Sequence, residues 1–330
     1  MNKAFIYIIS LLLFLNFSLT LQAQNNELLG TYKIVFIGKD KESSKYKAVF
    51  SGINDAAKTL GKAFSIEVEV FELSPIQGPE ESQSKSIIQS FLKNVDGIIL
   101  SPSENENLSS VLKLTQFHEK EIVLLEQPVN AITPLLTIQP DEFEAGKLAA
   151  KAILKKLPTQ GRVAILTSSD PSPIFDSRMQ GVKAILGYKR IEAVIKTEPN
   201  YKSALISIKQ AEKNDVNHYI NGWIFLDDWA LQGMPDLPWK PNSLPLVTIQ
   251  SSASTNLFYD LGYLQSMVLH PYHEWGYKAS EALIEKLFKK QNPTNNEYEA
   301  KPILVNWENI ELYKKPVSYT HLRAHETSNH

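Results

Sequence analysis

Polar residues that could bind a ligand follow a short apolar segment of this sequence. Residues 95–100 are rich in isoleucine, are too few for a helix and lie between two segments of helical periodicity, which predicts a buried parallel strand. Ser101-Pro102-Ser103-Glu104 comes next. Because ligands of open α/β sheets bind beyond the carboxyl ends of the strands, Glu104 is a candidate hydrogen-bond acceptor. The residues alone leave open the alternative that 101–104 only cap the next helix.

Two other arrangements could support catalysis or metal binding. Glu104 and Asp227 could act as a hydrolytic carboxylate pair across a cleft. Residues 270–274, His-Pro-Tyr-His-Glu, hold two imidazoles and a carboxylate, but their spacing matches no zinc-protease motif. The sequence has no glycine-rich phosphate loop, dinucleotide fingerprint or Gly-x-Ser-x-Gly turn. We therefore expect no enzyme, no metal site and no cofactor.

Composition narrows the class of protein. The chain has 330 residues, 43% of them apolar, and at roughly 150 residues per domain this length favours two domains. The net charge is -2, with lysine and arginine scattered, so we expect no nucleic-acid partner. The absence of cysteine from the sequence excludes disulfides, thiolate metal sites and a lipid anchor on an N-terminal cysteine.

The two ends of the chain differ from the rest. Residues 1–23 hold Lys3, an apolar run and Ala23, the pattern of a secretory signal peptide. A retained membrane anchor is the alternative, because the run is near the spanning length of about 18–20 residues. Residues 317–330 have no periodicity and resemble translated adapter sequence, so we expect a non-native tail. An exported chain without disulfides fits the bacterial periplasm.

Between these ends, segments with strand and helix patterns alternate in two series. The first series covers residues 32–125, where 66–71 alternate apolar and acidic residues as an edge strand does. Two prolines in residues 128–134 predict a crossover, and a second series follows from a helix that Asp141 caps. This pattern predicts an α/β fold of two similar lobes, each a doubly wound parallel sheet.

Several separate stretches carry a family resemblance through their order and spacing. They are residues 50–57, 95–102, 144–150, 178–182, 226–231 and 274–279. The chain from Tyr32 to Tyr313 resembles the type I periplasmic binding proteins for sugars, which share their fold with the ligand domain of LacI-type repressors. The resemblance implies lobes joined by three crossovers.

The expected crossovers give the boundaries of the lobes. They are placed near residues 128–134, 268–272 and 299–303. The N-terminal lobe then comprises residues 31–130 plus 271–300, and the C-terminal lobe 133–269 plus 302–313.

The resemblance also implies which residues line a cleft between the lobes. Tyr46 and Tyr201 stand at aromatic positions that stack on sugar faces, and Arg178 matches an arginine that forks onto sugar oxygens. From the residues alone, Tyr46 could instead pack at a helix start and Arg178 could lie on the surface. The implied ligand-binding residues are Tyr46, Gln83, Glu104, Arg178, Tyr201, Asp227, Asp228, Gln250 and His270.

Two of these positions depart from the family pattern. Gln250 stands where an aspartate is usual, and His270 where a glutamine is usual. The hydrogen-bonding pattern therefore differs from that of a standard pentose or hexose pocket. After the expected strand at residues 222–226, Asp227 or Asp228 matches a family Asn-Asp pair, although one of them could cap the following helix.

The resemblance implies a monomeric periplasmic protein that closes around a small molecule, expected to be a carbohydrate, and docks on a membrane permease for ABC-type uptake. The alternative is a ligand sensor that signals to a membrane receptor kinase. A repressor is not expected, because the chain begins with a signal-peptide pattern instead of a DNA-binding motif.

Overall fold

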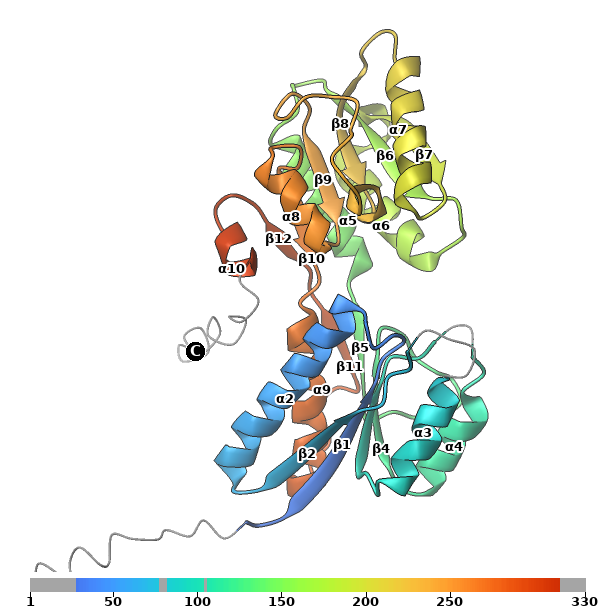
Figure 1. Ribbon diagram of the computed structural model, residues 1–330, viewed down its shortest axis with the longest axis vertical. Coiled ribbons are helices and arrows are strands. Elements are labelled where there is room, and N and C mark those ends of the chain that lie inside the picture. The colour runs from blue at the N-terminus through green and yellow to red at the C-terminus, as the bar shows by residue number, and fades with distance from the viewer. Residues whose placement is uncertain (1–27, 77–81, 104–105, 315–330) are drawn as a thin grey trace, which may run out of the picture.

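The chain folds into two α/β lobes that lie one above the other along the long axis of the molecule (Figure 1). The computed structural model describes residues 28–76, 82–103 and 106–314. The expected signal peptide (1–23) and non-native tail (317–330) fall outside these ranges. In the part of the chain that the structure describes, no helix is long and apolar enough to cross a membrane.

The N-terminal lobe is built on a six-stranded parallel sheet in the order β11-β5-β4-β3-β1-β2. Its elements are β1 (Thr31–Ile37), α2 (Ser44–Phe64), β2 (Glu67–Glu72), α3 (Gln83–Leu92), β3 (Gly97–Leu100), α4 (Ser109–Phe117), β4 (Glu121–Leu125), β5 (Leu136–Pro140), α9 (Tyr272–Ile284) and β11 (Glu297–Ala300). Helices α2 and α9 cover one face, and α3 and α4 cover the other. The strand β3 is therefore buried throughout, as its unbroken apolar sequence predicts, and β2 lies at the edge.

The C-terminal lobe repeats this plan with the order β12-β10-β9-β8-β6-β7, in which only the β10–β12 pair is antiparallel. Its elements are α5 (Glu142–Leu154), β6 (Arg162–Ser168), α6 (Pro173–Leu186), β7 (Ile191–Thr197), α7 (Tyr201–Asn214), β8 (Ile220–Phe225), β9 (Leu246–Ile249), α8 (Ala253–Asp260), β10 (Ser266–Leu269), β12 (Ile303–Val305) and α10 (Ile310–Lys314). Helices α5 and α6 pack on one face of the sheet and α7 packs on the other. The predicted two-lobed α/β fold is confirmed.

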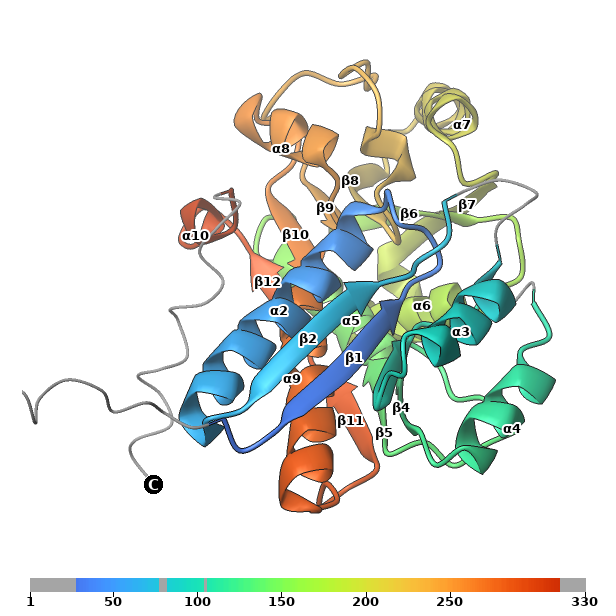
Figure 2. The same cartoon turned by 60° about the horizontal axis from the view of Figure 1, so that its bottom comes forward.

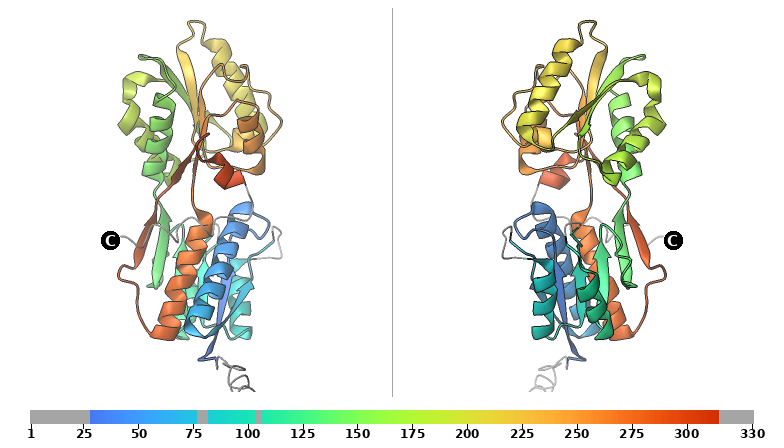
Figure 3. Two further views of the ribbon diagram at one scale, coloured as in Figure 1. Left: turned by 90° about the vertical axis from the view of Figure 1, so that its left-hand side faces the viewer. Right: turned by 90° about the vertical axis from the view of Figure 1, so that its right-hand side faces the viewer.

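The first crossing between the lobes differs from its expected position. Residues 128–134 do not leave the N-terminal lobe, because β5 follows them and pairs with β4 and β11 in the first sheet. The chain instead crosses between Pro140 and Glu142, so the expected boundary at 130–133 is wrong. The other crossings lie between Leu269 and Tyr272 and between Ala300 and Ile303. Figure 3 shows these connections from two further sides.

Two glycines fix the distance between α2 and α9, which lie side by side (Figure 2). A Cβ added to Gly52 would lie 1.9 Å from the carbonyl oxygen of His273, and one added to Gly276 would lie 1.9 Å from that of Val49. No side chain fits at such a distance, so only glycine allows the two backbones to touch.

The C-terminal lobe uses the same device between α5 and α6. A Cβ added to Gly146 would lie 2.0 Å from the carbonyl oxygen of Arg178, and one added to Gly181 would lie 2.0 Å from that of Phe143. All four glycines belong to the stretches that carry the family resemblance. The close packing of these helices therefore explains why those stretches contain glycine. The close contact also places Arg178 beside the first turn of α5.

Candidate functional site

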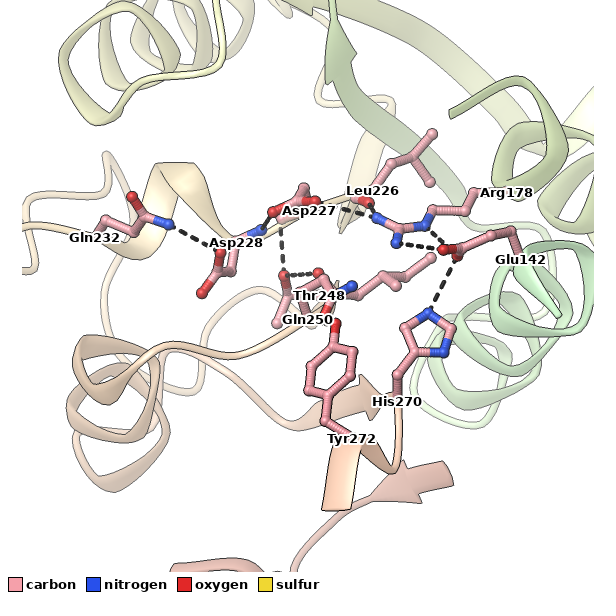
Figure 4. A network of polar contacts seen from close by, with 11 residues as sticks. Glu142, Arg178, Leu226, Asp227, Asp228, Gln232, Thr248, Gln250, His270 and Tyr272 are labelled. Carbon is pink, nitrogen blue, oxygen red and sulfur yellow. Dashed lines mark hydrogen bonds and ion pairs between the residues drawn. The ribbon is translucent and has the colours of Figure 1, made fainter. Parts of the chain in front are cut away.

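The strands of both sheets end at the edges of the lobes that face the hinge, and polar side chains gather there. Figure 4 shows those of the C-terminal lobe, where the loop after β8 meets the start of α5 and the second crossing. Helix α5 begins at this place because Asp141 caps it, accepting a hydrogen bond from the backbone nitrogen of Glu144 at 2.8 Å, as predicted. The next residue, Glu142, therefore points into the junction of the lobes.

Arg178 and Glu142 form a buried bidentate ion pair. The Nε and Nη2 atoms of Arg178 donate to the two carboxylate oxygens of Glu142 at 2.6 and 3.0 Å. Its Nη1 donates to the carbonyl oxygen of Leu226 at 2.6 Å and to Asp227 Oδ2 at 3.1 Å. The side chain of Arg178 is only 2% exposed. The family resemblance implies that this guanidinium group binds a ligand, but here it is hydrogen-bonded to other groups of the protein. Ligand contact by Arg178 therefore stays a prediction.

His270 completes this ion pair from the second crossing. Burial alone would raise the pKa of Glu142, but the charge of Arg178 and the bonds from His270 and Arg178 lower it to about 2. An ionised carboxylate only accepts hydrogen bonds, so the Nε2 of His270 is the donor to Glu142 Oε2 at 3.2 Å. His270 therefore ties the hinge to the C-terminal lobe, and a direct ligand contact by His270 is untested.

Asp227 and Asp228 play different parts after β8. Asp228 is buried and accepts hydrogen bonds from Gln232 Nε2 at 3.1 Å and Thr255 Oγ1 at 3.2 Å, so it holds the following loop to α8. The side chain of Asp227 is 26% exposed, and its Oδ1 accepts from the backbone nitrogen of Asp228 at 2.7 Å. Burial raises the pKa of Asp227 to about 6, against the opposing charge of Arg178. Asp227 is the acid of the pair that can face a ligand.

This raised pKa predicts a pH-dependent stability difference for Asp227→Asn. The folded pKa of about 6 lies above the ordinary value of 3.8, so ionising Asp227 destabilises the fold as pH rises from about 4 to 6. The variant removes that cost and should be more stable than the wild type at pH 7.5 by on the order of 1–3 kcal/mol. Urea unfolding at pH 4 and 7.5 measures it, and an equal difference at both pH values would contradict the assignment.

Equivalent residues in the two lobes adopt the same unusual backbone conformation. Glu126 directly follows β4 with a φ of 74°, and Gln250 directly follows β9 with a φ of 75°. The backbone nitrogen of Glu126 donates to Ile138 of the next strand at 2.7 Å, and that of Gln250 donates to Val268 at 2.8 Å. Positive φ is strained for such side chains, and strain of this kind gathers at binding sites.

Gln250 contacts the other lobe through Tyr272. The hydroxyl of Tyr272, in the first turn of α9, donates to Gln250 Oε1 at 2.5 Å (Figure 4). The carboxamide nitrogen of Gln250 has no partner among the described residues. The side chain therefore presents hydrogen-bond donors at the place where an aspartate would present acceptors.

Tyr46 and Glu126 lie on the opposite edge, in the N-terminal lobe. The hydroxyl of Tyr46 donates to Glu126 Oε1 at 3.0 Å and lies 3.3 Å from Ser101 Oγ. Burial and the neighbouring charge of Glu126 raise the pKa of Tyr46. The Nζ of Lys45 lies 5.3 Å from the ring centroid of Tyr46, whose side chain is buried. The expected stacking of Tyr46 on a sugar would therefore need Lys45 to move, and it stays a prediction.

Gln83 is buried, and both polar atoms of its carboxamide form hydrogen bonds with the backbone. Its Nε2 donates to the carbonyl oxygens of Gly38 and Ser101 at 2.8 and 2.7 Å, and its Oε1 accepts from the backbone nitrogen of Ser103 at 2.7 Å. These bonds join the ends of β1 and β3. Gln83 thus positions the edge of the lobe, while a ligand contact by it is untested.

The remaining expected site residues are Tyr201, which contacts a neighbouring loop, and Glu104. Tyr201 begins α7, and its hydroxyl donates to the carbonyl oxygen of Met234 at 2.6 Å while Gly233 packs on its ring. Glu104 falls outside the described residues. In the described part of the chain no three His, Cys, Asp or Glu side chains are arranged to hold a metal ion. His270 and His273 contact different carboxylates, Glu142 and Asp55.

Two acids at this site were not among the expected residues. Glu126 is the first polar residue after a buried strand, so the rule that selected Glu104 would have found it. Glu142 differs, because its partners Arg178 and His270 lie 36 and 128 residues away along the chain. No local pattern indicates such a pairing.

Solved structures share this fold at low sequence identity. A periplasmic ribose ABC transporter from Conexibacter woesei is 16% identical, with a TM-score of 0.72 over 87% of this chain and 95% of that one. An ABC transporter solute-binding protein from Burkholderia graminis, in complex with D-arabinose, is 18% identical, with a TM-score of 0.65 over 86% and 98%. A putative LacI transcriptional regulator from Bacteroides fragilis is 12% identical, with a TM-score of 0.64 over 86% and 99%.

At these identities the likeness concerns the fold alone, and no curated protein matches the chain. A family model described as a periplasmic binding protein domain matches residues 34–291, which include nearly all of the N-terminal lobe and most of the C-terminal one. With two parallel-sheet lobes joined by three crossings, the chain belongs to the periplasmic binding protein family.

Proposed function

We propose that the protein captures a sugar or sugar-like small molecule between its lobes and delivers it to a membrane permease for ABC-type uptake. The lobes close by bending at the three crossings, and no bond is made or broken in the ligand. The observation that carries this proposal is the matched pair Glu126 and Gln250. They stand at equivalent strand ends on either side of the hinge, in strained conformations that a fold tolerates where a ligand binds.

The contacts divide the site residues by role. Asp227 and Gln250 are proposed to bind the ligand, because both combine partial exposure with a position within two residues of a strand end. Arg178, Gln83 and Asp228 are proposed to hold the strand ends in place, since protein groups already occupy their polar atoms. In the closed form, Tyr46 and Tyr201 would add flat apolar surface to the two walls.

Transport is preferred to sensing because structures of this fold include proteins described as ABC transporter components. On this proposal the chain acts in the periplasm as a monomer, with the permease as its membrane partner. Signalling to a receptor kinase would use the same capture step. The proposed contacts make and break no bond, which fits a family of solute-binding proteins.

A thermal-shift screen over neutral sugars, sugar acids and polyols tests the capture step. A true ligand at 100 times its dissociation constant should stabilise the fold by about 2.7 kcal/mol. Small-angle scattering should show a smaller radius of gyration with that ligand, because the lobes close. If no sugar, sugar acid or polyol raises the melting temperature, the proposed function fails.

A further inference from the structure

Two lysines share one carboxylate at the edge of the N-terminal lobe. The Nζ of Lys39 lies 2.9 Å from Glu126 Oε2, and the Nζ of Lys45 lies 2.6 Å from Glu126 Oε1. Burial would raise the pKa of Glu126, but the two lysines lower it to about 2, so the carboxylate stays ionised. Two positive charges and one negative charge leave this lysine pair with a net charge of +1.

The lysine pair has unused donors. Glu126 already accepts a third bond, from the hydroxyl of Tyr46. Each ammonium group has three hydrogens, and among the described residues each forms its hydrogen bonds or ion pairs with Glu126 alone. The side chains of Lys39 and Lys45 are 30% and 29% exposed, so the remaining hydrogens can reach a bound molecule.

Aromatic rings hold Lys45 at the hinge side of this edge. Its Nζ lies 5.3 Å from the ring centroids of both Tyr46 and Tyr272. The hydroxyl of Tyr272 is in turn bonded to Gln250. The ammonium of Lys45 is therefore connected through one side chain to the residue that replaces the usual aspartate of the opposite lobe.

The lysine pair favours a ligand that carries a negatively charged group at the N-terminal edge. The lysine pair on one side and the carboxamide nitrogen of Gln250 on the other provide donors, while the acids Glu126, Glu142 and Asp227 are each already paired with a cation. A carboxylate on the ligand would accept from both lysines and cancel the net charge of +1. A neutral sugar would leave the remaining hydrogens of the two ammonium groups without an anionic acceptor when the lobes close and exclude water.

We propose that the ligand is an acidic monosaccharide whose single carboxylate binds to Lys39 and Lys45. This inference rests on the proposed function, because it names the class of molecule that the same site captures. A sugar phosphate carries more negative charge than the lysine pair can cancel, so a uronic acid is the better match.

Calorimetry with matched sugars tests the proposal. D-galacturonate and D-galactose, and D-glucuronate and D-glucose, differ only in whether carbon 6 is a carboxylate. At least one acid should bind 10-fold or more tightly than its neutral partner, and salt should weaken its binding. If the neutral sugars bind as well or better, the acidic ligand is ruled out while sugar capture stands. If none of these sugars binds and the wider screen is also negative, the proposed function itself fails.

Lysine variants assign the effect to these residues. Lys39→Met and Lys45→Met should each weaken binding of the acidic sugar at least 10-fold. Lys47→Met is the matched control, because Lys47 lies on the same helix as Lys45, is paired with Glu42 and is 56% exposed. It should change affinity less than 2-fold. Equal losses in all three variants, or tighter binding of galactose 6-phosphate than of galacturonate, would overturn the assignment. Lys45→Arg keeps the charge and provides the comparison if Lys45→Met does not fold.

Discussion

Replacing Arg178 with methionine is expected to lower the free energy of unfolding by about 3–5 kcal/mol. The change leaves the carboxylate of Glu142 buried with only His270 as a partner, because both of its oxygens accept from Arg178 in the wild type. Removing one member of a buried ion pair costs far more than the pair contributes, since the remaining charge is stranded away from water. Urea unfolding at pH 7 measures the loss.

The double variant Glu142→Met/Arg178→Met separates charge from packing. The double variant leaves no unpaired carboxylate at position 142, and the loss of the Arg178 bonds to Leu226 and Asp227 is common to both variants. The double variant should therefore recover at least half of the stability that Arg178→Met loses. A loss below about 1 kcal/mol in the single variant would contradict the buried pair. So would a double variant that is less stable than the single one.

The pH dependence gives an independent check on Glu142. Its folded pKa of about 2 lies below the ordinary value of 4.5. A depressed folded pKa adds stability that is complete above the unfolded value and is lost as pH falls from about 4.5 to 2. The stability difference between the wild type and Glu142→Met should therefore shrink over this range, in the opposite direction to the trend expected for Asp227.

Arg178 illustrates which part of the site the sequence could predict. Its position, beside a strand end and near the hinge, follows from the helix pattern and the family resemblance. Its partner does not, because Glu142 lies on another helix and local periodicity carries no information about such contacts. The same holds for Gln83, which was expected at the strand ends but whose three hydrogen bonds bind the protein's own backbone.

The fold was more predictable, because apolar runs separated by helical patterns specify a doubly wound sheet wherever they are long enough. The errors fall on short strands. β5 has five residues that end in Pro140, and it follows a segment interrupted by Pro128 and Pro134. β11 reads Glu-Tyr-Glu-Ala and is largely exposed at the sheet edge. Neither strand has a long apolar run that would identify it in the sequence. Their pairing in the structure shows that they belong to the first sheet, so the first crossing lies at residues 140–142.

Substituting alanine for Gly276 is expected to destabilise the N-terminal lobe by about 3 kcal/mol, at the upper end of the cost of overpacking. The new Cβ would lie 1.9 Å from the carbonyl oxygen of Val49, a backbone atom that cannot rotate away. Alanine gains about 1 kcal/mol in helix propensity over glycine, so any destabilisation must come from the helix contact. Ser51→Ala, on the exposed face of the partner helix, is the control and should stay within about 0.5 kcal/mol of the wild type.

A second variant, at Gly52, tests whether the loss of stability in Gly276→Ala comes from the contact between α2 and α9. Gly52→Ala meets the carbonyl oxygen of His273 at 1.9 Å, so by itself it should cost about as much as Gly276→Ala. Once either Cβ has forced the helices apart, the other finds room, and the double variant should lose clearly less than the sum of the two single losses. Strictly additive losses in urea unfolding would mean that each glycine acts through its own helix and not through the distance between the helices.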